Sequence, residues 1–231
     1  MGGGSKVKIA ILGASGRVGS RIAKEALMRG HQVVGIDVNI KEELKNQVEF
    51  YKIDMEDTEG VAGAIRGCDV YIFAVIPVLK GLDRIIPVVQ SAIEACKIAG
   101  VPRMIYICGG VSSWVRPGVY MLDDQKVPGH RQTHKANDAI IGSHEIALEY
   151  LRTVHDFDWC CQTAPLWMEE NMGGRTGKYR MGTEYPVLID PENKEISIQQ
   201  NCHISMEDFA VCMIDEVEQK RHHQCRYTVG Y

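Results

Sequence analysis

Short runs of apolar residues alternate along the chain with longer stretches in which apolar positions recur every three or four residues. The short runs are typical of buried parallel strands, and the longer stretches are typical of amphipathic helices. This alternation predicts an α/β fold with a doubly wound parallel sheet. The predicted strands are Val7–Leu12, Gln32–Asp37, Val48–Ile53, Val70–Val75, Arg103–Cys108 and Asp158–Thr163.

Helices are indicated between these strands. The first follows the opening strand and places Val18, Ile22 and Ala26 on one face. A second leads up to the fifth strand and ends at Gly100, and a third is predicted from about Arg131 to Val154. We therefore expect a single domain over residues 1–231, with residues 1–5 as a flexible lead.

The alternation breaks down after the sixth strand. Residues 171–181 are rich in glycine and basic side chains and predict a loop. Ligands of open α/β sheets bind beyond the carboxyl ends of the strands, so residues 164–204 are expected to form a small, irregular C-terminal cap on the substrate side. Further elements expected here are a β pair at Tyr185–Ile189 and Glu195–Gln199, a helix begun by Ser205 and a last strand at Cys225–Val229.

A glycine-rich turn joins the first strand to the first helix. Gly13 permits the tight turn, Gly16 lets the backbone approach a pyrophosphate, and Gly19 lets the helix pack close to the sheet. The helix start also offers unpaired N–H groups and the positive end of its dipole to phosphates. The turn therefore predicts a dinucleotide-binding site that also involves Ala14, Ser15, Arg17 and Val18.

An acidic residue closes the second strand. The Asp37 carboxylate can accept hydrogen bonds from an adenosine ribose and would repel a 2′-phosphate. NAD(H) is therefore the preferred cofactor, and NADP(H) stays possible because Arg17 could reach a phosphate. Asp54, at the end of the third strand, is expected near the adenine.

Composition narrows the class of protein. The chain has 231 residues, a net charge of −4 and 45% hydrophobic residues, which gives no electrostatic reason to expect nucleic acid or an anionic membrane. Its apolar stretches are too short to span a bilayer, and no signal peptide precedes the first strand. We expect a cytoplasmic protein whose eight cysteines are small buried hydrophobes, without a metal site.

Several motifs together resemble one known family. They are GASGRVG at 13–19, GCDVYIFAV at 67–75, CGGVSS at 108–113, GRTGKYRMG at 174–182, ISMEDFAVCMIDEVE at 204–218 and RYTVGY at 226–231. The chain resembles an atypical short-chain dehydrogenase/reductase of the NAD(P)H-binding, YwnB-like and NmrA-related group of NADH-flavin reductases. The resemblance covers nearly the whole chain and implies a Rossmann-type monomer or homodimer that binds a nicotinamide dinucleotide.

The tyrosine–lysine pair of short-chain dehydrogenases is missing. Those enzymes reduce carbonyls with Tyr-x-x-x-Lys, yet no tyrosine of this chain has a lysine four positions on. An electron-poor ring delocalises incoming charge and needs less acid catalysis than a ketone. The absence therefore favours a planar electron acceptor as the small-molecule substrate, and it fits a protein that binds the cofactor without chemistry equally well.

Other residues supply candidates for the site. Ser112 and Ser113 follow the fifth strand, where the resemblance places a hydroxyl near the nicotinamide. His130 and His134 begin the long predicted helix and could donate a proton. Strand ends expected to line the cofactor pocket contribute Ala74, Val75, Cys108, Gly109, Thr163, Ala164 and Pro165.

Three functions remain open on the sequence. The first is an NAD(P)H-dependent oxidoreductase that transfers hydride to a flavin or quinone-like acceptor. The second is a non-catalytic redox sensor or regulatory protein of NmrA type. A sugar-nucleotide epimerase or dehydratase is the third, and the missing Tyr-x-x-x-Lys disfavours it.

Overall fold

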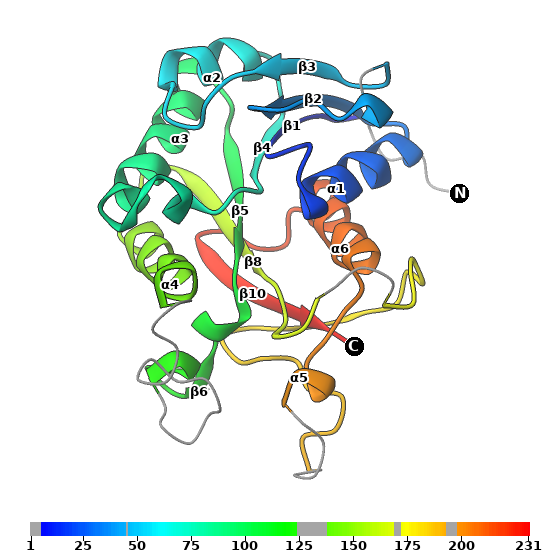
Figure 1. The fold of residues 1–231 in the computed structure, drawn as a ribbon, viewed down its shortest axis with the longest axis vertical. Coiled ribbons are helices and arrows are strands. Elements are labelled where there is room, and N and C mark those ends of the chain that lie inside the picture. Colours follow the sequence, from blue (N-terminus) through cyan, green and yellow to red (C-terminus); the bar gives the residue numbers. More distant parts are fainter. Residues whose placement is uncertain (1–5, 45, 124–137, 169–171, 193–197) are drawn as a thin grey trace.

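Eight strands form one sheet in the order β3-β2-β1-β4-β5-β8-β10-β9 in the computed structural model, which describes residues 6–44, 46–123, 138–168, 172–192 and 198–231. The order runs outward in both directions from β1 and β4, which confirms the predicted doubly wound sheet (Figure 1). All neighbouring pairs in it are parallel except β10 and β9. The strands are β1 Lys8–Leu12, β2 Gln32–Asp37, β3 Glu49–Lys52, β4 Val70–Phe73, β5 Arg103–Cys108, β8 Asp158–Thr163, β9 Arg180–Gly182 and β10 Cys225–Gly230.

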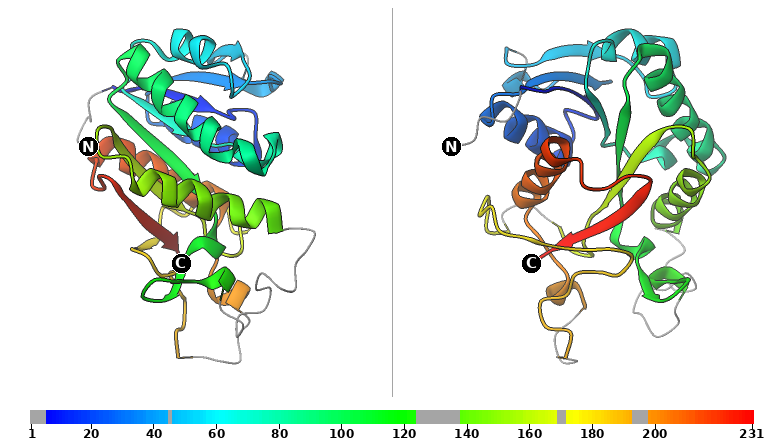
Figure 2. Two further views of the ribbon diagram at one scale, coloured as in Figure 1. Left: turned by 90° about the vertical axis from the view of Figure 1, so that its left-hand side faces the viewer. Right: turned by 180° about the vertical axis from the view of Figure 1, so that it is seen from behind.

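Helices cover both faces of the sheet. α1 (Arg17–Met28) and α6 (Met206–Gln219) lie side by side on one face. α2 (Thr58–Ile65), α3 (Ile85–Ala99) and α4 (Asp138–Arg152) cover the other, as Figures 1 and 2 show. The predicted third helix began at about Arg131, but residues 131–137 lie outside the described part of the chain.

Each face of the sheet has its own apolar core. The adjacent strand residues Cys160 and Cys161 point to opposite faces and belong to the two different cores. All eight cysteines are free, and every one except the half-buried Cys225 is buried. This arrangement agrees with their expected role as small hydrophobic side chains.

The predicted β pair after the sixth strand is wrong. Residues 185–189 form no strand, and Ile198–Asn201 is a short helix, α5. The backbone of this segment bonds elsewhere, because the Ile189 N–H donates to the Asn201 carbonyl and the Tyr185 carbonyl accepts from the Thr228 hydroxyl. The antiparallel edge strand is instead β9, which lies at the end of the predicted loop.

Two segments extend the fold beyond the carboxyl ends of β5 and β8. One is a small hairpin of β6 (Trp114–Arg116) and β7 (Val119–Tyr120), flanked by the 3₁₀ turns η4 (Gly110–Ser112) and η5 (Met121–Asp123). The other is the irregular segment that contains α5, seen below the sheet in Figure 1. Remaining 3₁₀ turns are η1 (Glu42–Leu44), η2 (Pro77–Lys80) and η3 (Leu82–Arg84). Over the described ranges, no helix has the length and apolar character required for a membrane span.

The three C-terminal motifs meet in one hydrogen-bonded cluster. The fully buried Asp208 carboxylate accepts from the backbone N–H groups of Thr176 and Gly177 and from the Tyr231 hydroxyl, at 2.7–2.8 Å. Ser205 caps α6 by accepting from the Asp208 N–H, as the sequence predicts, and its hydroxyl donates to the Gly174 carbonyl. These motifs therefore hold the chain end, α6 and the 174–178 loop together.

Candidate functional site

A cavity of about 430 Å³ lies at the carboxyl ends of the central strands, where the strand order reverses between β1 and β4. Switch points of this kind are where open α/β sheets bind ligands. The glycine-rich turn, β2, β4, β5 and β8 all contribute to its wall. The lining residues are Gly13, Gly16, Arg17, Val18, Asp37, Ala74, Val75, Ile76, Leu79, Ile107, Cys108, Gly109, His144, Ala164, Met168 and Met206.

The glycines of the turn are required by close backbone contacts. Gly13 has φ +81°, and a Cβ there would lie 2.7 Å from the Ala74 carbonyl oxygen. A Cβ on Gly19 would lie 2.1 Å from the Gly13 carbonyl oxygen, so α1 packs directly against the turn. Neither position accepts a side chain without moving backbone, which explains the glycine spacing in the sequence.

The start of α1 fits a pyrophosphate. Gly16 is the N-cap residue and has no side chain with which to cap the helix, and Arg17 and Val18 of the first turn line the cavity. The N–H groups of a first helical turn have no partner within the helix, and this end of the helix carries partial positive charge. Together with the Arg17 side chain, this is the environment that a nicotinamide dinucleotide needs for its phosphates.

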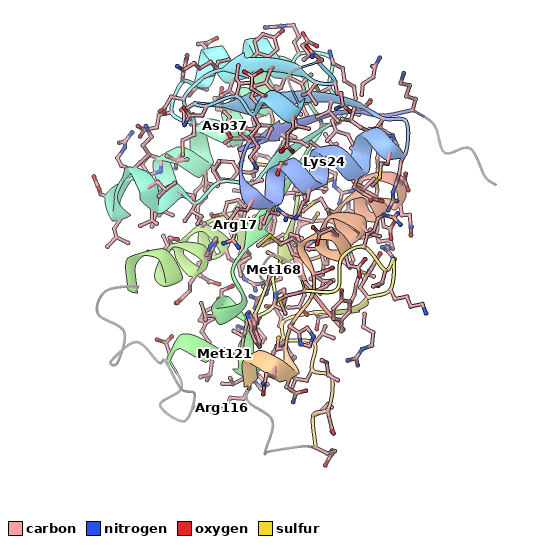
Figure 3. All side chains as sticks on the ribbon, turned by 45° about the vertical axis from the view of Figure 1, so that its right-hand side comes forward. Arg17, Lys24, Asp37, Arg116, Met121 and Met168 are labelled. Atoms are coloured by element: carbon pink, nitrogen blue, oxygen red, sulfur yellow. The ribbon has the colours of Figure 1, made fainter. Side chains whose placement is uncertain are left out.

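Asp37 lies at one end of the cavity and is already held in place. One carboxylate oxygen accepts from the Ser15 N–H at 3.0 Å, and the other accepts from the Asn39 N–H at 3.2 Å. Each carboxylate oxygen can accept more than one hydrogen bond, so both keep capacity for ribose hydroxyls. In Figure 3, Asp37, Arg17 and Met168 follow one another down the middle of the molecule.

The other end of the cavity is mostly apolar. Ile107 and Ala164 come from the ends of β5 and β8, and the flexible side chains of Met168 and Met206 complete the wall. The Ala164 N–H donates to the Cys108 carbonyl at 2.9 Å and holds the two strand ends together. This end can therefore hold a flat, apolar ring system.

His144 also lines this end, and our sequence reasoning missed it. The ring packs on the end of β5, where a Cβ on Gly109 would lie 2.6 Å from His144 Cδ2. Its buried Nδ1 has no hydrogen-bond partner among the described residues. Nothing in the local sequence distinguishes this histidine, and only the packing of α4 on β5 brings it to the cavity.

Some predicted cofactor residues support the cavity from outside its lining. Ala14 and Thr163 are buried, and the Ser15 N–H holds Asp37. Pro165 packs against Gly110, where a Cβ would lie 2.8 Å from the proline backbone. Gly19 acts through its contact with Gly13.

Asp54 lies outside the lining. Its carboxylate accepts from Lys80 Nζ at 2.6 Å and from the Glu56 N–H at 3.0 Å. The Lys80 hydrogen bond lowers the pKa of Asp54. Asp57, three positions on, caps α2 by accepting from the Gly60 N–H. The contacts of Asp54 are thus those of a surface ion pair.

Two of the four candidate catalytic residues, Ser112 and Ser113, lie outside the cavity lining. Ser112 and Ser113 are buried, and the Ser112 hydroxyl donates to the Gly109 carbonyl at 2.6 Å. Ser112 Oγ also accepts from Arg226 at 3.1 Å. His130 and His134 lie outside the described residues.

A partly buried ionic network contacts Ser112 through Arg226. The Arg226 side chain has no exposed surface and forms a salt bridge with Glu184. Both oxygens of Glu184 also accept from Arg152 of α4, at 2.8 Å each. The network therefore joins β10, the 184 segment and α4 behind the loop that follows β5.

The comparisons with known proteins agree with this geometry. The family model for NAD(P)H-binding proteins matches residues 13–187. The uncharacterized protein YwnB of Bacillus subtilis (strain 168) is 26% identical over 227 residues, covering 96% of this chain and 98% of its own length.

Solved structures extend the likeness over nearly the whole chain. A proposed epimerase from Bacteroides thetaiotaomicron is 33% identical, with a TM-score of 0.80 and 98% of both chains covered. A proposed exported protein from Burkholderia pseudomallei is 32% identical, with a TM-score of 0.81, covering 97% of this chain and 100% of its own. A proposed NADH-flavin reductase from Streptococcus pneumoniae TIGR4 shares the fold at 23% identity and a TM-score of 0.78, with 97% and 99% covered.

Proposed function

This chain belongs to the NAD(P)H-binding family, and we propose that it is an oxidoreductase that uses NAD(P)H to reduce a flavin or quinone-like acceptor. The cavity carries the proposal. It runs from Asp37, past the start of α1, to an apolar end lined by Ala164 and Met168. These are the three environments that ribose, pyrophosphate and a planar ring require.

In this proposal the protein positions the cofactor in the cavity and excludes water from it. Asp37 binds ribose hydroxyls, the first turn of α1 binds phosphates, and the ends of β5 and β8 hold the nicotinamide ring against the apolar wall. The bound cofactor supplies the hydride. Ser112 acts as a positioning residue, because its hydroxyl bonds the Gly109 carbonyl at the cavity wall.

Asp37 supports a preference for NAD(H) over NADP(H). Its carboxylate would lie beside the adenosine ribose and would repel a 2′-phosphate. Arg17 lines the same cavity and is the residue through which NADPH would still gain affinity. Titration of the protein with NADH and NADPH decides the preference, and tighter binding of NADPH overturns it.

Steady-state oxidation of NADH with free FMN, FAD and small quinones tests the proposed reaction. The proposal predicts oxidation that depends on both the protein and the acceptor and that saturates with NADH. Cofactor binding without turnover with any of these acceptors contradicts it and favours the non-catalytic, NmrA-type sensor instead.

An epimerase is the second candidate, because the 33% identical Bacteroides thetaiotaomicron protein is a proposed epimerase. The chain lacks the Tyr-x-x-x-Lys pair with which short-chain dehydrogenases move the substrate proton. Incubation with UDP-glucose and NAD, followed by chromatography of the sugar nucleotides, separates the two candidates. Formation of UDP-galactose favours the epimerase.

A further inference from the structure

The apolar end of the cavity offers few hydrogen-bond donors from side chains. Ile107, Ala164, Met168 and Met206 carry none. The Cys108 thiol is fully buried and faces the Ser112 hydroxyl at 3.2 Å. Among the residues that line this end, the His144 ring is therefore the donor available to a ring ligand.

The packing of His144 orients its imidazole. A Cβ on Gly109 would lie 2.6 Å from Cδ2 and 3.3 Å from both Cγ and Nε2, so the Cδ2 corner of the ring, next to Nε2, faces Gly109 at the cavity wall. Nδ1, on the opposite side of the ring, is buried without a partner in the described part of the chain. A hydrogen on a buried nitrogen without a partner is costly, so this packing favours the tautomer that carries its hydrogen on Nε2.

We propose that His144 Nε2 donates a hydrogen bond to the acceptor, at a ring carbonyl oxygen or ring nitrogen. This inference rests on the proposed function and narrows its substrates to planar acceptors with such an atom at the ring edge. Negative charge develops on that atom during reduction, and a positioned donor stabilises it. Overall, the acceptor gains a hydride from the cofactor and one proton, which comes from water.

Several titratable groups surround the His144 ring. Tyr106 meets the ring edge-on at 6.4 Å between centroids, and burial raises the pKa of its hydroxyl well above the ordinary value. Lys80, on the 3₁₀ turn that packs against α4, pairs with Asp54. The other titratable or charged side chains described on its helix are Glu145, Glu149, Tyr150 and Arg152. Those of the cavity lining are Arg17, Asp37 and Cys108.

Three variants test the donor. His144→Phe keeps a flat ring and removes the N–H, whereas His144→Gln keeps an N–H donor. Gly109→Ala keeps the histidine and displaces its ring. The matched control is His155→Gln, because His155 is exposed, follows the end of α4 and lies outside the cavity lining.

The main readout is binding, so it does not depend on turnover. Calorimetry measures the Kd of menadione and of FMN in the presence of NAD, alongside the Kd of NADH for each variant. We expect His144→Phe and Gly109→Ala to weaken acceptor binding about tenfold, with His144→Gln recovering most of the loss. The NADH Kd of His144→Phe should stay within about twofold of wild type, and His155→Gln should match wild type throughout.

Turnover then separates this inference from the proposed function. Loss of donation should lower kcat for menadione about 100-fold in His144→Phe. Wild-type acceptor affinity and kcat in His144→Phe overturn the role of His144 and leave the reductase intact. If acceptor binding depends on His144 but the wild type shows no turnover, the proposed reductase function is contradicted and the hydrogen bond from His144 is supported.

Discussion

The Ser15 backbone N–H donates to the Asp37 carboxylate across 3.0 Å and ties the glycine-rich turn to the end of β2. A second N–H, from Asn39, fixes the other carboxylate oxygen. The residue that would meet the ribose is therefore oriented before any cofactor binds. Preorganisation of this kind lowers the entropic cost of binding.

Asp37→Asn should weaken NADH binding about tenfold, because the amide accepts on one oxygen only and loses the charge. NADPH should lose less affinity, since the carboxylate that repels its 2′-phosphate is gone. Fluorescence titration with both cofactors measures the ratio of the NADH and NADPH dissociation constants. Asp54→Asn is the control, because Asp54 lies outside the cavity lining and bonds Lys80. An unchanged ratio in Asp37→Asn would show that Asp37 does not contact the ribose.

Gly19→Ala should abolish measurable NADH binding and destabilise the fold by about 1–3 kcal/mol. The new Cβ would lie 2.1 Å from the Gly13 carbonyl oxygen, and that backbone has to move. Gly63→Ala is the matched control, since no atom lies within 4 Å of a Cβ there and alanine favours the α2 helix by about 0.5–1 kcal/mol. Urea unfolding and NADH titration of both variants check this pair, and normal binding by Gly19→Ala refutes the turn geometry.

Asp208→Asn should destabilise the protein by about 1–3 kcal/mol, because a buried carboxylate that accepts several hydrogen bonds is replaced by an amide that cannot accept them all. Limited proteolysis should cut the 174–178 loop faster, since the loop is held by this side chain. NADH affinity should change little. A protease-resistant loop in Asp208→Asn would mean that the loop is held by other contacts.

Glu25 should make stability depend on pH in acid. Burial alone raises the pKa of Glu25, but hydrogen bonds from Arg175 and Arg29 outweigh it and hold the pKa below its ordinary value of 4.5. A lowered folded pKa contributes stability that is complete above 4.5 and is lost as the pH falls through the folded value.

Glu25→Gln should therefore be less stable than wild type at pH 7, by about 1.5–3 kcal/mol, and the gap should narrow below pH 4.5. Urea midpoints measured from neutral pH into acid show the trend. A gap that is constant over this range would place the stabilisation in packing and not in charge.

Much of the fold follows from the local sequence pattern. The remaining parts depend on contacts between residues that are far apart in the sequence. The apolar runs predicted β5 and β8 to the residue, since buried parallel strands need continuous apolar sequence. The segment at 185–189 has the same local pattern but bonds to Asn201 and Thr228, which no nearby residue specifies.

The candidate site likewise contains residues that local sequence predicts and one that only tertiary packing reveals. Gly13 and Asp37 were predicted because backbone geometry and ribose recognition demand particular residues at a fixed spacing. His144 was missed because its place depends on how α4 packs against Gly109. The C-terminal motifs contributed to the family resemblance, and residues from them converge on Asp208 to hold the fold together.

The most direct test of the proposed reductase is a single turnover with NADH that carries deuterium at C4 of the nicotinamide. Protein, labelled NADH and menadione are mixed, and the loss of NADH fluorescence is followed beside unlabelled NADH. The account predicts protein-dependent oxidation that slows with the label and disappears in Gly19→Ala. NADH that stays bound and unoxidised in the presence of acceptor would contradict it.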